Sequence, residues 1–171
     1  MEVSWMDIIS LFFAAAAFFF SLWQFSAETK RNRKEATIHA FDALEENPAV
    51  LFLFKVEKQR IIELVQYKAN SNLHENITSQ VATEWEAINT ALPLIEHFAV
   101  GINSEIYDLE TLNKMAGNLM ITIWNRCSSL IEFKRRGSYN QNNYTEFETM
   151  VNSLKKLRRK TDQSILTNLF D

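Results

Sequence analysis

The chain has 171 residues and a formal net charge of −3, a length that allows one domain and a short appendage. It contains only 3 Gly and 2 Pro, which excludes a β-sandwich or barrel with frequent tight turns and predicts a mostly helical chain. One Cys excludes an intramolecular disulfide, and 3 His leave little material for a transition-metal site. The acidic charge balance argues against nucleic acid as a partner.

The first expected element is an apolar helix over residues 8–25. These 18 residues carry no charge, and at about 1.5 Å per residue they extend roughly 27 Å, the thickness of a bilayer's hydrocarbon core. Glu2 and Asp7 precede the run and no small-residue cleavage site follows it, which distinguishes it from a secretory signal peptide. We therefore expect residues 1–29 to form a transmembrane anchor whose first partner is membrane lipid.

Charge predicts the orientation of this anchor. All 18 Lys and Arg lie after residue 29, and the positive-inside rule places the side with the cations in the cytoplasm. We expect a single-pass membrane protein with its N-terminus outside and its C-terminus cytoplasmic. Four basic residues stand directly behind the span: Lys30, Arg31, Arg33 and Lys34.

Small and polar residues recur along one side of the expected span at spacings of three and four. Such a stripe lets two membrane helices approach closely and form hydrogen bonds, so it predicts a homo-oligomer. The alternative is that Ala and Ser are ordinary constituents of a membrane helix. The predicted helix–helix interface consists of Ser10, Ala14, Ala17, Ser21 and Gln24.

The rest of the chain is expected to be all-α. Residues 30–47 lack Gly and contain no Pro, which predicts a basic juxtamembrane helix that continues the span. Asn47 is the expected cap and Pro48 the first residue of the next helix. Residues 48–160 should form a cytoplasmic bundle of about four helices, and residues 161–171 a C-terminal tail.

Apolar periodicity divides the bundle into these helices. The first should run from Pro48 to a polar stretch that starts at Lys68. The second contains Pro93, which should kink it, and should end at Gly101. Asp108 is the expected cap of the third.

The last helix should begin with a capping box formed by Thr145 and Glu148. Gly117 lies within the third helix, where glycine is costly, and therefore predicts a close approach of another element. Trp85 and Trp124 lie on or beside the apolar stripes, so we expect both to be shielded from water.

A second basic cluster occupies the end of the last helix. Cations there offset the negative end of the helix dipole, which is the plain structural interpretation. Contact with anionic lipid headgroups is the alternative, because the domain is tethered near the membrane. The cluster consists of Lys155, Lys156, Arg158, Arg159 and Lys160.

Catalytic patterns are almost absent from the sequence. It has no Gly-rich phosphate loop and no zinc or di-iron motif, so no enzyme activity, cofactor or metal is predicted. Glu96, His97 and Cys127 are the only candidates for acid–base or nucleophilic roles. Adjacent residues on a helix point about 100° apart, so Glu96 and His97 do not form a pair. We interpret His97 as a hydrogen-bonded, semi-buried side chain and Cys127 as an inert core thiol.

Several segments follow the expected span in a recognisable order. They are Arg31, Arg33, Ala36, Thr37 and Phe41, then residues 94–102, Trp124, Arg135, Arg136 and residues 144–147. A terminal span followed by these segments resembles a family of small bacterial single-span membrane proteins known only as a domain of unknown function. The resemblance implies a cell inner-membrane setting and a helical cytoplasmic part, and it brings no catalytic residue. Some proteins of this build act in defence against phage, which is an analogy.

Two functions remain open at this point. The first is a membrane-anchored interaction module that docks an unknown cytoplasmic protein partner. The alternative is a membrane-acting effector, for example in phage defence, that oligomerises and disturbs the bilayer. A pore needs more polarity than Ser10, Ser21 and Gln24 offer, so the module ranks first; an enzyme-like domain on an anchor ranks third.

Overall fold

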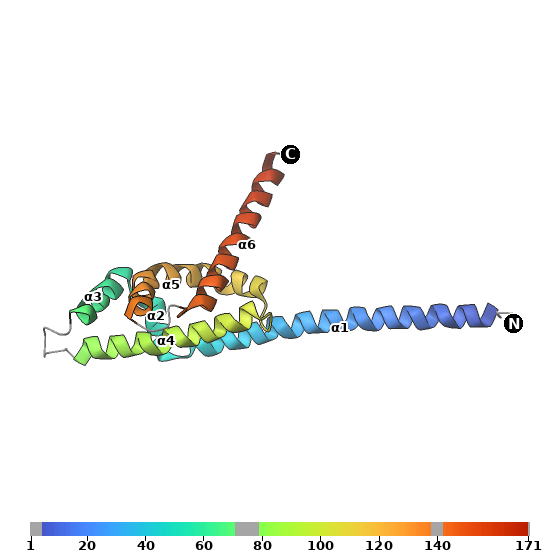
Figure 1. Ribbon diagram of the computed structural model, residues 1–171. Coiled ribbons are helices and arrows are strands. Elements are labelled where there is room, and N and C mark those ends of the chain that lie inside the picture. Colours follow the sequence, from blue (N-terminus) through green and yellow to red (C-terminus); the bar gives the residue numbers. More distant parts are fainter. Residues whose placement is uncertain (1–4, 71–78, 138–141, 171) are drawn as a thin grey trace.

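The computed structural model describes the backbone of residues 5–70, 79–137 and 142–170, and within these ranges the side chains of all residues except 6–11 and 161–170. This described part consists of six α-helices and contains no strand. The prediction of an all-α chain is confirmed. One long helix, α1, projects far beyond a bundle that the other helices build around its C-terminal end (Figure 1).

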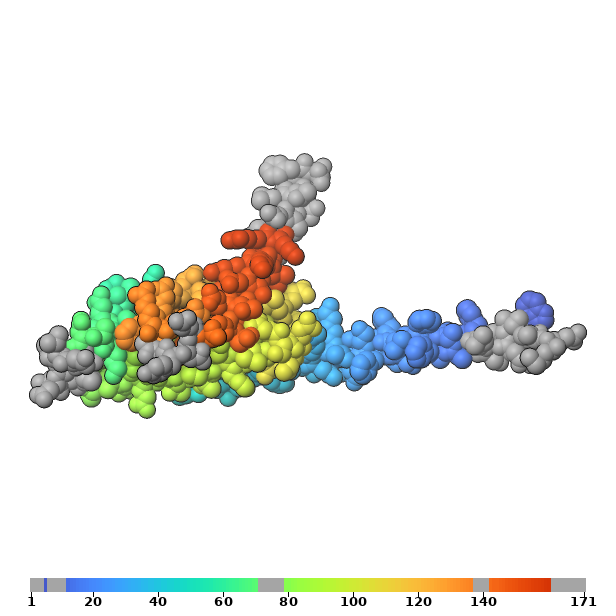
Figure 2. Space-filling model, viewed as in Figure 1, coloured from blue at the N-terminus to red at the C-terminus, as the bar shows by residue number. Residues whose placement is uncertain are grey.

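The six helices follow one another with short connections. Helix α1 is a single helix of 41 residues, and in the space-filling view its N-terminal half stands alone, away from the bundle (Figure 2). Within the bundle, α4 packs against α2 and α6, and α5 packs against α3 and α6. The bounds are α1 Trp5–Glu45, α2 Pro48–Lys55, α3 Lys58–Ala69, α4 Ser79–Asn103, α5 Leu109–Gly137 and α6 Thr145–Phe170.

The C-terminal end of α1 belongs to the core of the bundle. Phe41 is only 3% exposed, and its ring contacts those of Phe54 and Phe98 at centroid distances of 6.3 and 6.2 Å. Thr37 is fully buried, and its Oγ1 accepts a hydrogen bond of 2.7 Å from the backbone N–H of Asp108. Helix α1 is therefore fixed to the bundle both by apolar packing and by a polar contact.

Two helix starts occur where local sequence predicts them. The Asn47 side chain accepts hydrogen bonds from the backbone N–H groups of Ala49 and Val50, and Pro48 opens α2. Asp108 accepts from the backbone N–H and the hydroxyl of Thr111, at 2.8 and 2.7 Å. In both cases a short polar side chain satisfies N–H groups that the first helical turn leaves unpaired.

The single helix predicted from Pro48 to Lys68 is wrong. The chain leaves the helical conformation at Val56, with φ −63° and ψ 136°, and α3 starts two residues later. Arg126 on α5 donates hydrogen bonds to the carbonyls of Phe54 and Val56 at 3.1 and 3.3 Å, which satisfies oxygens that the break leaves without helical partners. The described part of residues 48–160 therefore holds five helices where about four were expected.

Gly101 does not end α4, contrary to the prediction. The helix continues through it to Asn103, and a Cβ on Gly101 would lie 2.3 Å from the ring of Tyr107. That ring stacks on Phe98 with a centroid distance of 5.4 Å. Glycine is needed here for the close approach of an aromatic ring. Pro93 lies inside the same helix, which continues on both sides of it.

The predicted capping box of α6 is also wrong. Thr145 is already helical, and the Glu96 carboxylate of α4 accepts hydrogen bonds from the backbone N–H groups of Glu146 and Phe147 at 3.1 and 2.7 Å. Glu148 instead pairs with Arg135 at 2.8 Å. Helix α6 is thus capped by a distant side chain.

Gly117 lies within α5, close to the ends of neighbouring side chains. A Cβ on Gly117 would lie 2.7 Å from Oδ1 of Asn113 on the same helix and 3.1 Å from Nη2 of Arg158, so glycine leaves room for the ends of two side chains, one of them from α6. Trp85 and Trp124 are half-buried and pack against the core, so they are shielded only in part.

Candidate functional site

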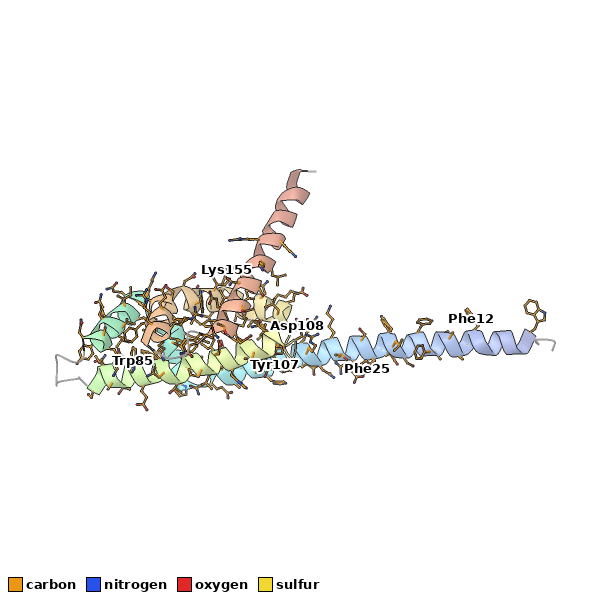
Figure 3. All side chains as sticks on the ribbon, in the orientation of Figure 1. Phe12, Phe25, Trp85, Tyr107, Asp108 and Lys155 are labelled. Atoms are coloured by element: carbon orange, nitrogen blue, oxygen red, sulfur yellow. The ribbon has the colours of Figure 1, made fainter. Side chains whose placement is uncertain are left out.

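The N-terminal half of α1 presents large apolar side chains to its surroundings. Phe12 and Phe25 are 71% and 72% exposed, and Figure 3 shows both on the part of α1 that extends beyond the bundle. None of these side chains belongs to the described core. The exposed set between residues 5 and 25 is Trp5, Phe12, Phe13, Phe18, Phe19, Phe20, Leu22, Trp23 and Phe25.

Among the residues whose side chains the structure describes, no helix combines the length and the apolar character that a membrane span requires. The predicted span of residues 8–25 overlaps residues 6–11, whose side chains are outside that description. Ser10 of the predicted interface is one of these. Ala14, Ala17, Ser21 and Gln24 are all exposed, and the Ser21 hydroxyl donates to the carbonyl of Ala17 at 2.9 Å.

The four basic residues behind this segment fall into two groups. Lys30 and Arg31 are exposed, and Arg31 lies 3.5 Å from Glu35 on the same helix. Arg33 and Lys34 are half-buried at the junction with the bundle. Arg33 pairs with Glu105 of the α4–α5 turn at 3.2 Å, so this part of the predicted basic surface contacts protein.

Asp108 lies at the same junction (Figure 3). Burial alone raises the pKa of its carboxyl, but the hydrogen bonds from Thr111 and the charges of Lys34 and Arg33 outweigh that effect. The net result is a pKa below the ordinary value, because these contacts favour the ionised form.

The C-terminal basic cluster is also divided. Arg158 binds α5: its Nε donates to Oδ1 of Asn113 at 2.7 Å, and its Nη1 contacts Oδ1 of Asn118. Lys155 is half-buried, whereas Lys156, Arg159 and Lys160 are exposed. Arg158 therefore serves helix packing, and the exposed members form the remaining candidate surface.

The three residues with potential catalytic chemistry are not brought together. Glu96 caps α6, and His97 is exposed on the neighbouring position of α4. Cys127 is fully buried, and burial raises the pKa of its thiol to about 12, an effect that the charge of Arg126 only partly opposes. Within the described part of the chain, no group of three or more His, Cys, Asp or Glu could hold a metal ion.

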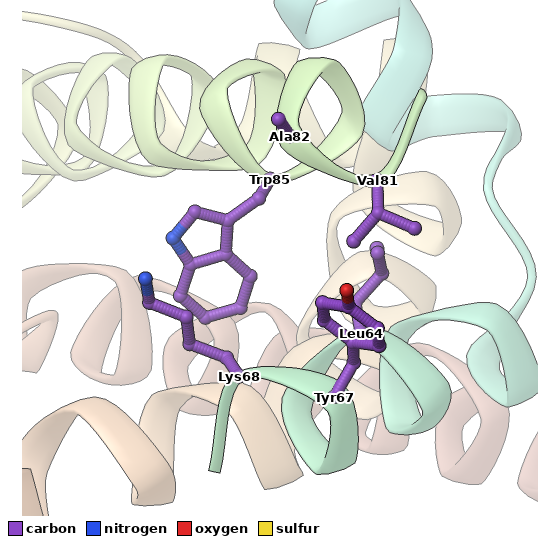
Figure 4. A pocket seen from close by; sticks show the side chains of 6 residues that line it. All are labelled: Leu64, Tyr67, Lys68, Val81, Ala82 and Trp85. Atoms are coloured by element: carbon purple, nitrogen blue, oxygen red, sulfur yellow. The ribbon is translucent and has the colours of Figure 1, made fainter. Parts of the chain in front are cut away.

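A cavity of about 140 Å³ lies between α3 and α4, and we call it the Trp85 pocket. Its walls are mostly apolar, with the Lys68 ammonium on one side. Figure 4 shows Trp85 projecting from α4 toward the side chains of α3. The lining residues are Leu64, Tyr67, Lys68, Val81, Ala82 and Trp85.

A larger hollow of about 440 Å³ adjoins this pocket, and we call it the Lys134 hollow. The two share Lys68 and Trp85 as a common wall. The hollow also contains Asn89, Phe133, Lys134, Asn143 and Tyr144.

Lys134 is held by neutral groups. Its Nζ lies 2.5 Å from Oδ1 of Asn89 and 3.3 Å from the hydroxyl of Tyr144. It also stands over the rings of Trp85 and Tyr144, at 5.9 and 5.7 Å from their centroids. Burial lowers the pKa of this ammonium, because desolvation disfavours the charged form.

The profile of a family described as a domain of unknown function, DUF4760, matches residues 11–154. The chain belongs to the DUF4760 family. Comparison with curated proteins and with solved structures gave no match. The family resemblance is thus confirmed at the level of this domain, and the membrane setting remains a prediction.

Sequence reasoning missed the paired pockets of this DUF4760 protein. Trp85 was expected only to be shielded from water. The spacing of Trp85 and Asn89 places both on one face of α4, which was the only local signal. The approach of Lys134 from α5 is a tertiary contact that periodicity does not encode.

Proposed function

We propose that this DUF4760 protein is a membrane-anchored helical module. In this proposal the N-terminal half of α1 lies in the inner membrane with its N-terminus outside, and the bundle lies in the cytoplasm, where it docks a protein partner. The observation that supports the proposal is the set of nine large apolar side chains exposed between residues 5 and 25. Removing one such side chain from water contributes about 1.5–3 kcal/mol, so the set favours an apolar environment.

Membrane extraction tests the anchor. Ala16→Arg with Phe19→Arg places two charges in the middle of the apolar segment, where each costs about 2.5–3.5 kcal/mol of insertion free energy. We expect the natural chain to stay in the membrane fraction after alkaline carbonate treatment, and the variant to leave it. The control is His39→Arg with Asp42→Arg, two exposed positions on the bundle half of α1. A natural chain released by carbonate would contradict the anchor.

Cysteine labelling tests the orientation. In a Cys127→Ala background, an impermeant thiol reagent applied to intact cells should label Glu2→Cys and leave Lys156→Cys unlabelled. Both sites should react after the membrane is opened. The opposite pattern in intact cells would show that the positive-inside rule was misapplied to this chain.

Self-association through the small-residue stripe is the second part of the proposal. Ala14→Leu with Ala17→Leu adds bulk on the stripe and should weaken crosslinking between copies while insertion is kept, because small residues permit close helix approach. Ala15→Leu with Ala16→Leu is the matched control off the stripe. Equal crosslinking in the two double variants would show that the stripe is not the contact between copies.

The effector alternative has a separate readout. Induced expression in cells loaded with a membrane-potential dye would depolarise them rapidly if the chain disturbs the bilayer. A stable potential is the outcome that the module proposal requires.

A further inference from the structure

We propose that the Trp85 pocket and the Lys134 hollow together form one binding site for a small organic anion that carries an aryl or branched alkyl group. The chemical class we infer is an aryl-alkyl carboxylate. This inference goes beyond the membrane-anchored module and does not depend on the anchor, since every lining residue lies in the bundle.

The Trp85 pocket supplies the apolar end of the site. Leu64 is 2% exposed at its base, and Val81 and Trp85 close it from α4. Its volume of about 140 Å³ is close to that of an engineered cavity of about 150 Å³ that binds benzene. A group the size of a phenyl ring therefore fits, and the mostly apolar walls favour an apolar group.

The Lys134 hollow supplies the anionic end. Two half-buried arginines of the bundle, Arg60 and Arg135, are paired with carboxylates at 2.8 Å, whereas Arg126 and Arg158 contact neutral oxygens. Lys134 lines the hollow, and in the described part of the chain it forms no ion pair and contacts neutral oxygens and ring faces. An anion in the hollow would provide the missing charge-assisted hydrogen bond.

The common wall determines how the ligand is arranged. Lys68 and Trp85 border both cavities, so one molecule with a short spacer can place its apolar group in one and its carboxylate in the other. The ammonium of Lys68 adds a second positive charge beside the path between them. Figure 4 shows this ammonium next to the indole of Trp85.

Calorimetry on the full-length chain in lipid nanodiscs tests the site, with empty nanodiscs to subtract partition into lipid. The probes are phenylacetate, 3-phenylpropionate and 4-phenylbutyrate, which differ in spacer length. We expect at least one to bind. Its neutral amide should bind about tenfold more weakly or worse, because a hydrogen bond to a charged group contributes that much. The ring-free propionate should also bind about tenfold more weakly or worse, because it leaves the apolar pocket empty. An amide that binds as tightly as its acid would overturn the proposal, as would failure of all three acids at millimolar concentration.

Two variants assign the binding to this site. Lys134→Met should weaken acid binding about tenfold or more, and Ala82→Phe, made at an exposed position on the rim, should block the apolar end. Lys156→Gln removes an exposed lysine of α6 and should leave binding unchanged. If Lys134→Met does not fold, Ala82→Phe still decides. Unchanged affinity in a folded Lys134→Met or Ala82→Phe variant would place any binding elsewhere and overturn the proposal.

Discussion

Single carboxylates hold helix ends in this bundle, and Glu96 is the one with the longest reach along the sequence. It caps α6 from 50 residues away. Glu96→Ala leaves two N–H groups of α6 without their partner, so we expect the free energy of unfolding to fall by about 1–2 kcal/mol. Urea denaturation measures it. Glu86→Ala, at an exposed position of the same helix, is the control, and an equal loss in both variants would contradict the capping role.

The Asp108 carboxylate makes the stability of the bundle depend on pH, and the sign of this dependence is known. Its pKa is lowered in the folded protein, so its charge stabilises the fold above the ordinary aspartate value, and this stability is lost as pH falls through the folded pKa. Asp108→Asn keeps a capping oxygen and removes the charge. Between about pH 5 and about pH 3, the variant should lose less stability than the natural chain. Urea denaturation at each pH measures the free energy of unfolding. An equal loss of this free energy in the two proteins would show that the Asp108 charge is not involved.

The sequence reveals the start of a helix more readily than a break between two helices. Asn47 and Asp108 could be identified as caps because the N–H groups they bind lie within three residues. The break at Val56 could not, since the stabilising Arg126 is 70 residues away and neither Gly nor Pro marks the position. The cap of α6 was misassigned for the same reason: a local Thr–Glu pattern was present, but the carboxylate of Glu96, 50 residues away, accepts the hydrogen bonds.

The same distinction applies to the candidate site. Apolar spacing predicted that Trp85 would be shielded from water, but it gave no information on which helices meet. A pocket is defined by side chains from separate helices, here α3, α4 and α5. Its existence could therefore be known only once these helices were placed.

Gly101 provides a test at the level of packing between elements. Gly101→Ala puts a methyl group 2.3 Å from the Tyr107 ring, which must move off Phe98. Despite the better helix propensity of alanine, we expect thermal unfolding to report a loss of about 1–3 kcal/mol. Combining it with Tyr107→Leu should cost less than the sum of the two single changes, because the ring that clashes is gone. Strict additivity would mean that the ring and the glycine are not coupled.

For the whole molecule, the decisive feature is that α1 belongs to two regions at once. The described side chains of its outer half are exposed, whereas Phe41 near its end is 3% exposed within the core. Phe41→Ala should lower the free energy of unfolding of the bundle by about 3–5 kcal/mol, as for other buried Phe positions. Phe25→Ala is the matched control, since Phe25 is 72% exposed on the same helix. Similar losses from both changes would show that the end of α1 is not part of the core.

The continuity of α1 also has a mechanical consequence. Its 41 residues correspond to roughly 60 Å of helix, with no flexible linker between the apolar half and the bundle. Such a helix transmits rotation: when its outer half rotates about the helix axis, its inner half rotates with it. Thr37 holds the inner half to the start of α5, and Arg33 holds it to the α4–α5 connection. Torque on the outer half therefore first acts on the bundle at this connection.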